Sequence, residues 1–113
     1  MAANDYCLVI SSIDDPARAA AIADKAVEKR LASGVNTING VHSVYRWKGA
    51  IEKAEELVLI FYTRASLVES LSALIKELHP YELPAILAVD IAKGLPDFLS
   101  WIGSNTASHV EDY

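Results

Sequence analysis

Residues 41–64, VHSVYRWKGAIEKAEELVLIFYTR, contain two strand-like runs joined by a polar turn around Gly49. The first run, residues 41–47, alternates β-branched and aromatic residues with polar ones. The second run, residues 57–62, is an unbroken series of apolar and aromatic residues flanked by charges. Both patterns are typical of β-strands, so this segment is predicted to form a β-hairpin.

The second arm of the hairpin is apolar on both of its faces. Successive side chains of a strand point to opposite faces of the sheet, so a strand with one face in water has a polar residue at every second position. Here both sets of alternating residues are apolar or aromatic: Leu57, Leu59 and Phe61 on one face, and Val58, Ile60 and Tyr62 on the other. The strand therefore requires cover on both sides.

Length and composition limit the classes of protein that the chain can represent. A chain of 113 residues fits one domain, predicted to have its core at about 6–102 and a mobile tail at 103–113. The hydrophobic content of 52% and the mean hydropathy of +0.22 are high for a soluble domain. No run approaches the roughly 18 uncharged apolar residues of a membrane span, so no membrane partner is expected.

Charge and cysteine usage narrow the partners and the compartment. The net charge is −5, and the ten basic residues are dispersed along the chain. Nucleic-acid binding, which needs basic residues gathered on one face, is therefore not expected. The single cysteine, Cys7, excludes an internal disulfide, and the N-terminal residues lack the basic segment of a secretory signal. We expect a cytoplasmic protein.

The first half of the chain is predicted to contain a strand, a helix and a short strand before the hairpin. Residues 6–12 form a short apolar run that favours a buried strand. Asp15, which precedes a proline, is a predicted N-cap, and the amphipathic helix that follows is predicted to end at Gly34 in a left-handed conformation. Residues 35–38 indicate a strand, followed by a turn or bulge at Asn39 and Gly40.

The second half repeats the helix–strand order. Ser66 and Glu69 have the spacing of a capping box at the start of an amphipathic helix, which is predicted to stop at His79 because a proline follows. Residues 85–92 form a second strand that is apolar on both faces, and residues 96–102 a short helix. The pattern predicts an α+β, ferredoxin-like split βαβ fold (βαββαβ plus a short C-terminal helix), an antiparallel sheet with both long helices on one face.

Two helices on one face leave the other apolar face of the sheet open. A straight strand over residues 34–47 would run about 46 Å at roughly 3.3 Å per residue, which exceeds the roughly 35 Å diameter of a compact domain of this length. It must overhang the domain or bend at Asn39 and Gly40. An open face with long hairpin arms predicts a homo-oligomer, most simply a closed ring. In the alternative, a monomer, the C-terminal helix and tail would cover this face.

Four segments resemble the CutA family of divalent-cation tolerance proteins: RLASGVN at 30–36, SVYRWKGAIE at 43–52, HPYELPAIL at 79–87 and DFLSWI at 97–102. The resemblance extends over nearly the whole domain. It implies a ferredoxin-like subunit in a tight homotrimer, similar in architecture to PII signalling proteins. It also implies a role in the response to divalent metal ions, copper binding, and clefts between subunits near the HPYE segment.

The chain departs from the family pattern at positions that bear on metal binding. Family members often carry Cys where this chain has Gly34, and some carry Cys where it has Ser11. An acidic residue is usual at the positions of Ala54 and Ala85, and Lys at that of Tyr62. Thiolate, imidazole and carboxylate are the groups that hold copper or zinc. These departures predict weak binding of divalent metal.

The candidate site residues are aromatic and charged residues of the hairpin, of the HPYE segment and of the C-terminal DFLSWI segment. Their predicted location is an inter-subunit cleft or interface: Tyr45, Trp47, Lys48, Glu56, Tyr62, Tyr81, Glu82 and Trp101. His79 is the single candidate metal ligand, with Glu82 as a second donor for Cu or Zn. The alternative for His79 is a helix C-cap that bonds a last-turn carbonyl.

Other charged and reactive residues are predicted to have structural roles. Glu55 and Glu56 are expected to form cross-strand ion pairs with Arg46 and Lys48. His42 and His109 are expected at the surface, without a partner. Cys7 is expected to be a buried structural thiol rather than a nucleophile.

The sequence is compatible with two classes of function. The first is a non-enzymatic trimeric binding or signalling protein, with a divalent metal ion or a small anionic ligand held between subunits and no resident cofactor assigned. The alternative is a small acylphosphatase-like hydrolase on the same fold. It would need an arginine and an asparagine near a phosphate, for which Arg18 and Asn36 are the candidates.

Overall fold

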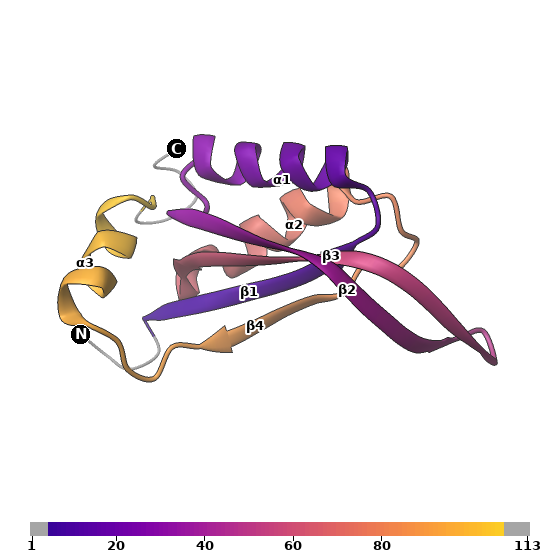
Figure 1. Cartoon of the computed structure of the whole chain (residues 1–113). Helices are drawn as coiled ribbons and strands as arrows, with labels where there is room; N and C mark the ends of the chain where they lie inside the picture. Colours follow the sequence, from indigo (N-terminus) through magenta and orange to yellow (C-terminus); the bar gives the residue numbers. More distant parts are fainter. Residues whose placement is uncertain (1–4, 108–113) are drawn as a thin grey trace.

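A computed structural model describes residues 5–107 of the chain (Figure 1). Its elements are β1 (Tyr6–Ile13), α1 (Pro16–Glu28), β2 (Gly34–Trp47), β3 (Ala50–Arg64), α2 (Val68–Leu78), β4 (Ile86–Asp90) and α3 (Pro96–Ser104). All strand pairs are antiparallel, in the order β2-β3-β1-β4. The α+β, split βαβ prediction is therefore confirmed.

The hydrophobic core lies between the sheet and the layer formed by α1 and α2 (Figure 1). The sheet contributes alternate residues, so that Val9 and Ile13 of β1 and Leu59 and Phe61 of β3 are fully buried. Val58, Ile60 and Tyr62 point to the opposite face and are only half-buried. The prediction that β3 has two apolar faces is confirmed, and only one of them is covered by α1 and α2. No helix among residues 5–107 is long and apolar enough to cross a membrane.

Helix α1 begins as predicted and ends earlier than predicted. Asp15 accepts a hydrogen bond from the Arg18 amide at 3.1 Å, which satisfies an orphan donor of the first turn. The predicted end at Gly34 is wrong, because the left-handed residue is Arg30, with φ 59°. The amide of Leu31 reaches the Ala26 carbonyl at 2.9 Å, the longer bond of a Schellman motif. This motif buries Leu31, and the apolar contact outweighs the preference for glycine.

Helix α2 is entered through a 3₁₀ turn, Ala65–Leu67, instead of directly from a capping box. Ser66 lies inside that turn, and the N-cap position of α2 is Leu67, whose side chain makes no cap bond. The predicted N-cap position at Ser66 is therefore wrong. The 3₁₀ turn places Leu67 in the core, where it is fully buried. The predicted stop at His79 is confirmed.

The β2–β3 hairpin is the long feature of the molecule and projects beyond the helices at the right of Figure 1. Its two-residue turn is Lys48 and Gly49, both with positive φ, 48° and 83°, as in a type I′ turn. The predicted irregularity at Gly40 is confirmed as a shift of register between Ile38 and Val41. The strand does both of the things expected from its length: it bends there and overhangs, so that the longest extent of the molecule is 44 Å.

Strand β4 and helix α3 follow in the predicted order. Helix α3 lies at the end of the sheet opposite the hairpin tip (Figure 1), where Phe98 meets Tyr62 edge-on at 5.6 Å between ring centroids. It leaves much of the open face uncovered, and Leu87 and Val89 of β4 remain 63% and 48% exposed. The face expected to need cover is therefore only partly covered within one chain.

Three of the first five residues of the predicted tail, 103–107, pack against the domain. Gly103, Thr106 and Ala107 are buried. The Arg64 guanidinium donates to the Gly103 carbonyl at 2.6 Å, and the Ala107 amide donates to the Arg30 carbonyl at 3.0 Å. These bonds join the segment to the ends of β3 and α1. The rest of the predicted tail, residues 108–113, lies outside the described residues, as does His109.

Candidate functional site

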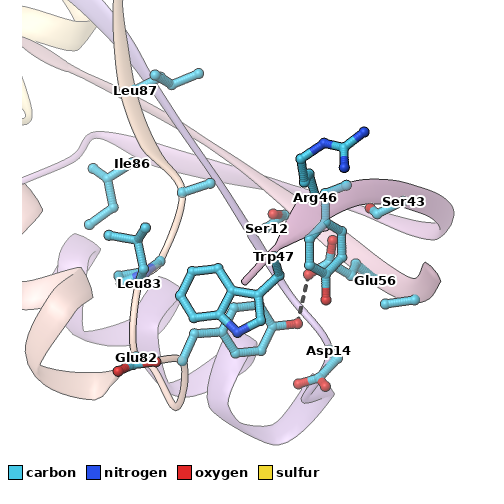
Figure 2. Close-up of a pocket in the computed structure, with 15 residues that line it drawn as sticks. Ser12, Asp14, Ser43, Arg46, Trp47, Glu56, Glu82, Leu83, Ile86 and Leu87 are labelled. Carbon is cyan, nitrogen blue, oxygen red and sulfur yellow. Dashed lines mark hydrogen bonds between the residues drawn. The ribbon is translucent and has the colours of Figure 1, made fainter. Parts of the chain in front are cut away.

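A pocket of about 780 Å³ lies between the hairpin and the loop that follows α2 (Figure 2). It takes residues from both arms of the hairpin, from the end of β1, from the loop and from the start of β4. Its lining residues are Ser12, Asp14, Ser43, Tyr45, Arg46, Trp47, Ala54, Glu56, Tyr81, Glu82, Leu83, Pro84, Ala85, Ile86 and Leu87. Five of the eight residues predicted for a cleft line this pocket. A sixth, Lys48, contacts the lining residue Glu82.

His79 holds the loop against the end of β1. Its Nε2 lies 2.7 Å from the Ser12 carbonyl oxygen. A carbonyl can only accept, so Nε2 carries the hydrogen. The other ring nitrogen, Nδ1, then accepts the Tyr81 amide at 3.1 Å. The side chain is almost fully buried, and both ring nitrogens are engaged.

The last carbonyl of α2 is bonded by a different residue from the one expected. Arg18 of α1 donates to the Leu78 carbonyl at 3.2 Å, whereas the His79 ring turns away from its own helix to Ser12. The prediction that the His79 ring bonds a last-turn carbonyl is therefore wrong. The extended backbone of His79, with ψ 135°, directs the chain out of the helix and carries the ring toward β1.

The loop delivers Tyr81 to a buried carboxylate on β3. The Tyr81 hydroxyl donates to Glu56 Oε2 at 2.6 Å, the bond drawn as a dashed line in Figure 2. Burial raises the pKa of Tyr81, and the Glu56 carboxylate beside it raises that pKa further, with smaller effects from Asp14 and Tyr45. Tyr81 is therefore a hydrogen-bond donor at neutral pH. Glu56 itself is only 6% exposed.

The hairpin tip places an ammonium group beside two residues that line the pocket, Trp47 and Glu82. Lys48 Nζ lies 3.4 Å from Glu82 Oε2 and 5.4 Å from the centroid of the Trp47 ring. This pair links the turn of the hairpin to the loop after α2. Because both charged side chains are well exposed, the pair contributes little stability by itself.

The predicted cross-strand ion pairs of the hairpin are not the observed ones. The register places Glu55 opposite His42 and Glu56 opposite Val41. His42, expected to lack a partner, lies 3.0 Å from Glu55. The two-residue turn explains the error, because it sets Arg46 opposite Ile51, well along the arm from both glutamates.

The single thiol has the structural role expected of it. Cys7 is buried as predicted, with its sulfur 3.5 Å from a carboxylate oxygen of Asp90. Burial raises the pKa of the Cys7 thiol, and the neighbouring Asp90 raises that pKa further. A thiol held in its protonated form is a poor nucleophile.

Two residues predicted for the same cleft lie elsewhere. Tyr62 and Trp101 are at the α3 end of the sheet, where Trp101 stacks on Phe98 and its ring lies against Gly34. The Tyr62 hydroxyl donates to the Asn36 side chain. The predicted residues thus form two groups, one at each end of the sheet.

The donor groups in this structure do not fit a metal centre built by one chain. No group of three or more His, Cys, Asp or Glu side chains among residues 5–107 is arranged to hold a metal ion. Both nitrogens of the His79 ring are bonded, and Glu82 is paired with Lys48. A metal at His79 would have to displace the bond to Ser12 or the bond to Tyr81.

Arg18 and Asn36, the candidate residues for hydrolysis, both make hydrogen bonds or ion pairs within the fold. Arg18 pairs with Asp15 at 3.7 Å and caps α2. Asn36 lies on β2 opposite Ile60, on the open face, and accepts the Tyr62 hydroxyl. They belong to different layers of the molecule, and no phosphate-binding arrangement joins them.

Sequence reasoning missed Asp14, Ser12 and Arg46 as lining residues of the pocket. Asp14 directly follows β1 and resembles the start of a helix more than a site residue. Its place in the pocket depends on the path of the loop after α2. A signal was nevertheless present, because a second acidic residue beside the N-cap Asp15 is not needed for capping.

Comparison with known proteins identifies the family. The model of the CutA1 divalent ion tolerance protein family matches residues 7–105. The chain belongs to the CutA1 family. A curated CutA1 relative, the divalent-cation tolerance protein CutA of Thermus thermophilus, is 37% identical over 88% of this chain and 96% of its own length. The mouse protein CutA is 40% identical over 77% of this chain, and the match spans about half of the mouse protein, 49%.

Solved CutA1 structures have the same fold. The Cut A1 protein of Thermus thermophilus superposes with a TM-score of 0.88 at 36% identity, covering 90% of this chain and 99% of that one. CutA of Xylella fastidiosa superposes with a TM-score of 0.86 at 38% identity, covering 89% and 97%. The predicted membership of the CutA family is therefore confirmed.

Proposed function

We propose that this chain is a non-enzymatic, homotrimeric binding protein of the divalent-cation tolerance type, which holds its ligand in the pocket between the hairpin and the loop after α2. The observation that carries the proposal is the apolar sheet face that α3 leaves uncovered. Leu87, 63% exposed on that face, also lines the pocket. A second copy that covered the face would therefore also form a wall of the pocket.

Assembly would serve binding as well as stability. In a single chain the pocket is partly open to solvent. The hairpin, which contributes lining residues from both arms, projects beyond the helices (Figures 1 and 2). A copy seated against the open face would exclude water from the apolar side chains and narrow the pocket. The number three is what the resemblance to the CutA family implies. A cytoplasmic location fits the single cysteine, which is buried and unpaired.

The role in metal tolerance is proposed to be indirect or to use weak sites. The two donors considered for copper or zinc, His79 and Glu82, are both engaged by other groups. A ligand-controlled signal passed between subunits would connect the pocket to a metal response without a high-affinity metal centre. The separation of Arg18 from Asn36 supports a binding role over hydrolysis.

Titration of metal-free protein with Cu²⁺ and with Zn²⁺ tests this assignment. We expect weak binding by calorimetry, with no loss on replacement His79→Ala, because the His79 ring is bonded to the backbone on both sides. The same samples should show a homotrimer by light scattering. A sub-micromolar constant that His79→Ala abolishes would contradict the weak-site proposal. A monomer would contradict the whole assignment.

A further inference from the structure

We propose that the pocket selects an organic cation, a protonated or quaternary amine, with Glu56 as its charge partner and Tyr45, Trp47 and Tyr81 as its aromatic walls. This inference rests on the proposed function and names the ligand class of the same site. It replaces the small anionic ligand expected from the sequence.

Glu56 is a carboxylate without an ion-pair partner among residues 5–107. Glu56 as a residue is 6% exposed, and the bond that its carboxylate makes among residues 5–107 is the one from the Tyr81 hydroxyl. None of the ion pairs in the described part of the chain includes Glu56. A buried carboxylate is costly unless a positive group or several donors stabilise it. A positive group seated beside Glu56 would therefore be stabilised by this carboxylate.

The charges of the pocket lining also favour a cationic ligand. Three carboxylates line the pocket, those of Asp14, Glu56 and Glu82, against one lining cation, Arg46. Glu82 is already paired with Lys48, which leaves two carboxylates against one cation. Figure 2 shows the Arg46 guanidinium directed away from the dashed bond at Glu56, and the two side chains form no ion pair. An anion in this pocket would face an excess of negative charge. A cation would be attracted to it.

The aromatic walls distinguish an organic cation from a bare metal ion. Tyr45, Trp47 and Tyr81 line the same pocket, and aromatic faces attract ammonium groups through the ring quadrupole. A metal ion would need several close oxygen, nitrogen or sulfur donors, and no such group of acidic, His or Cys side chains occurs within residues 5–107. A large, soft cation satisfies the aromatic rings and the carboxylate together.

The chain already holds one ammonium group in this manner. Lys48 Nζ lies over the Trp47 ring and beside Glu82. This is the combination, an aromatic face with a carboxylate, that we infer for the ligand at Glu56. Because Lys48 occupies Trp47 and Glu82 at the mouth of the pocket, it competes with a ligand cation for both.

Two substitutions of opposite effect test the inference. Choline is the probe, with its uncharged carbon isostere dimethylbutanol and acetate as comparison ligands, all at one ionic strength. We expect choline to bind more tightly than either, by calorimetry on the intact assembly. Glu56→Gln should weaken choline binding about tenfold or more, because it removes the charge and keeps an acceptor for Tyr81. Lys48→Gln should strengthen binding about two- to fivefold, because it frees Trp47 and Glu82.

If Glu56→Gln destabilises the fold, Lys48→Gln still tests the inference. Lys48 and its partner Glu82 are both exposed, so replacing Lys48 should not disturb the fold. Dimethylbutanol binding as tightly as choline, tighter binding of acetate, no binding of choline, or weaker binding in Lys48→Gln would each overturn the inference. Acetate binding that Tyr81→Phe weakens would leave the proposed function intact and exclude the cation. A change in oligomer size instead of choline affinity in Glu56→Gln would mean that a neighbouring copy supplies the cation, which also overturns it.

Discussion

Thr63 and Ser11 are two buried hydroxyl side chains on the helix-facing side of the sheet, with different surroundings. Thr63 is fully buried, and its hydroxyl donates to the Leu31 carbonyl at 2.6 Å, just beyond the end of α1. Ser11 is equally inaccessible, and its hydroxyl is the buried side-chain atom without a hydrogen-bond partner in the described structure. Removal of the hydroxyl is therefore expected to destabilise the protein at Thr63 and to have little effect at Ser11.

We expect Thr63→Val to lower the free energy of unfolding by about 1–3 kcal/mol, because it leaves the Leu31 carbonyl buried without a donor. Ser11→Ala should change it by less than about 1 kcal/mol, since no bond is lost. Urea denaturation at one fixed protein concentration measures both, which matters if assembly contributes. Equal losses for the two variants would contradict the assignment of these bonds.

At the scale of the element, helix α1 depends on caps at both ends. Asp15 satisfies an amide at its start, and the Schellman motif at Arg30 closes its end. Pattern reasoning found the first cap, because a capping side chain lies next to the bond that it makes. It missed the second, because a positive φ at an arginine is uncommon and glycine is the usual signal.

Asp15→Ala should lower the stability of the protein by about 1 kcal/mol, since it removes the bond to the Arg18 amide. The matched control is Asp24→Ala, which removes an exposed carboxylate from the interior of the same helix and should have little effect or a small stabilising one. Thermal unfolding followed by circular dichroism gives the comparison. A larger loss from Asp24→Ala would show that net charge, and not capping, governs α1.

At the scale of the whole molecule, the partly covered sheet face connects fold and assembly. Helix α3 covers only the end near Tyr62, and the apolar residues of β4 remain accessible. An exposed apolar surface of this kind marks an interaction site. The proposed second copy of the chain would cover this face and also complete the pocket.

Val89→Glu should dissociate the proposed trimer, because it puts a charge in the centre of the face that copies would share, away from the pocket lining. Val27→Glu, at a comparably exposed apolar position on α1, is the control and should leave the assembly intact. Light scattering after size-exclusion chromatography measures the mass of each. If Val27→Glu dissociates the assembly and Val89→Glu does not, the interface lies on the helix side.

Much of the fold was predictable from local pattern. Periodicity located the strands and the two-faced character of β3, although it began this strand at residue 57 instead of Ala50. The proline after His79 located the stop of α2, and Asn39 and Gly40 located the bulge. These features depend on neighbours in the chain, so side-chain alternation and the nearby Gly and Pro residues were sufficient. The N-cap of α2 was placed one residue too early, at Ser66, because the 3₁₀ turn that buries Leu67 has no signal in the local pattern.

The sequence predicted which residues belong to a site, but only the tertiary structure showed that they form two separate groups. Tyr62 and Trp101 went to the α3 end, while Glu56 and Tyr81, 25 residues apart, met in the pocket. His79 became the anchor of the loop by reaching Ser12, 67 residues away. No local pattern encodes such contacts, because they depend on strand register and on the path of a loop around the sheet edge. Chain-local preferences set the elements, and long-range packing set which charges and rings share a cavity.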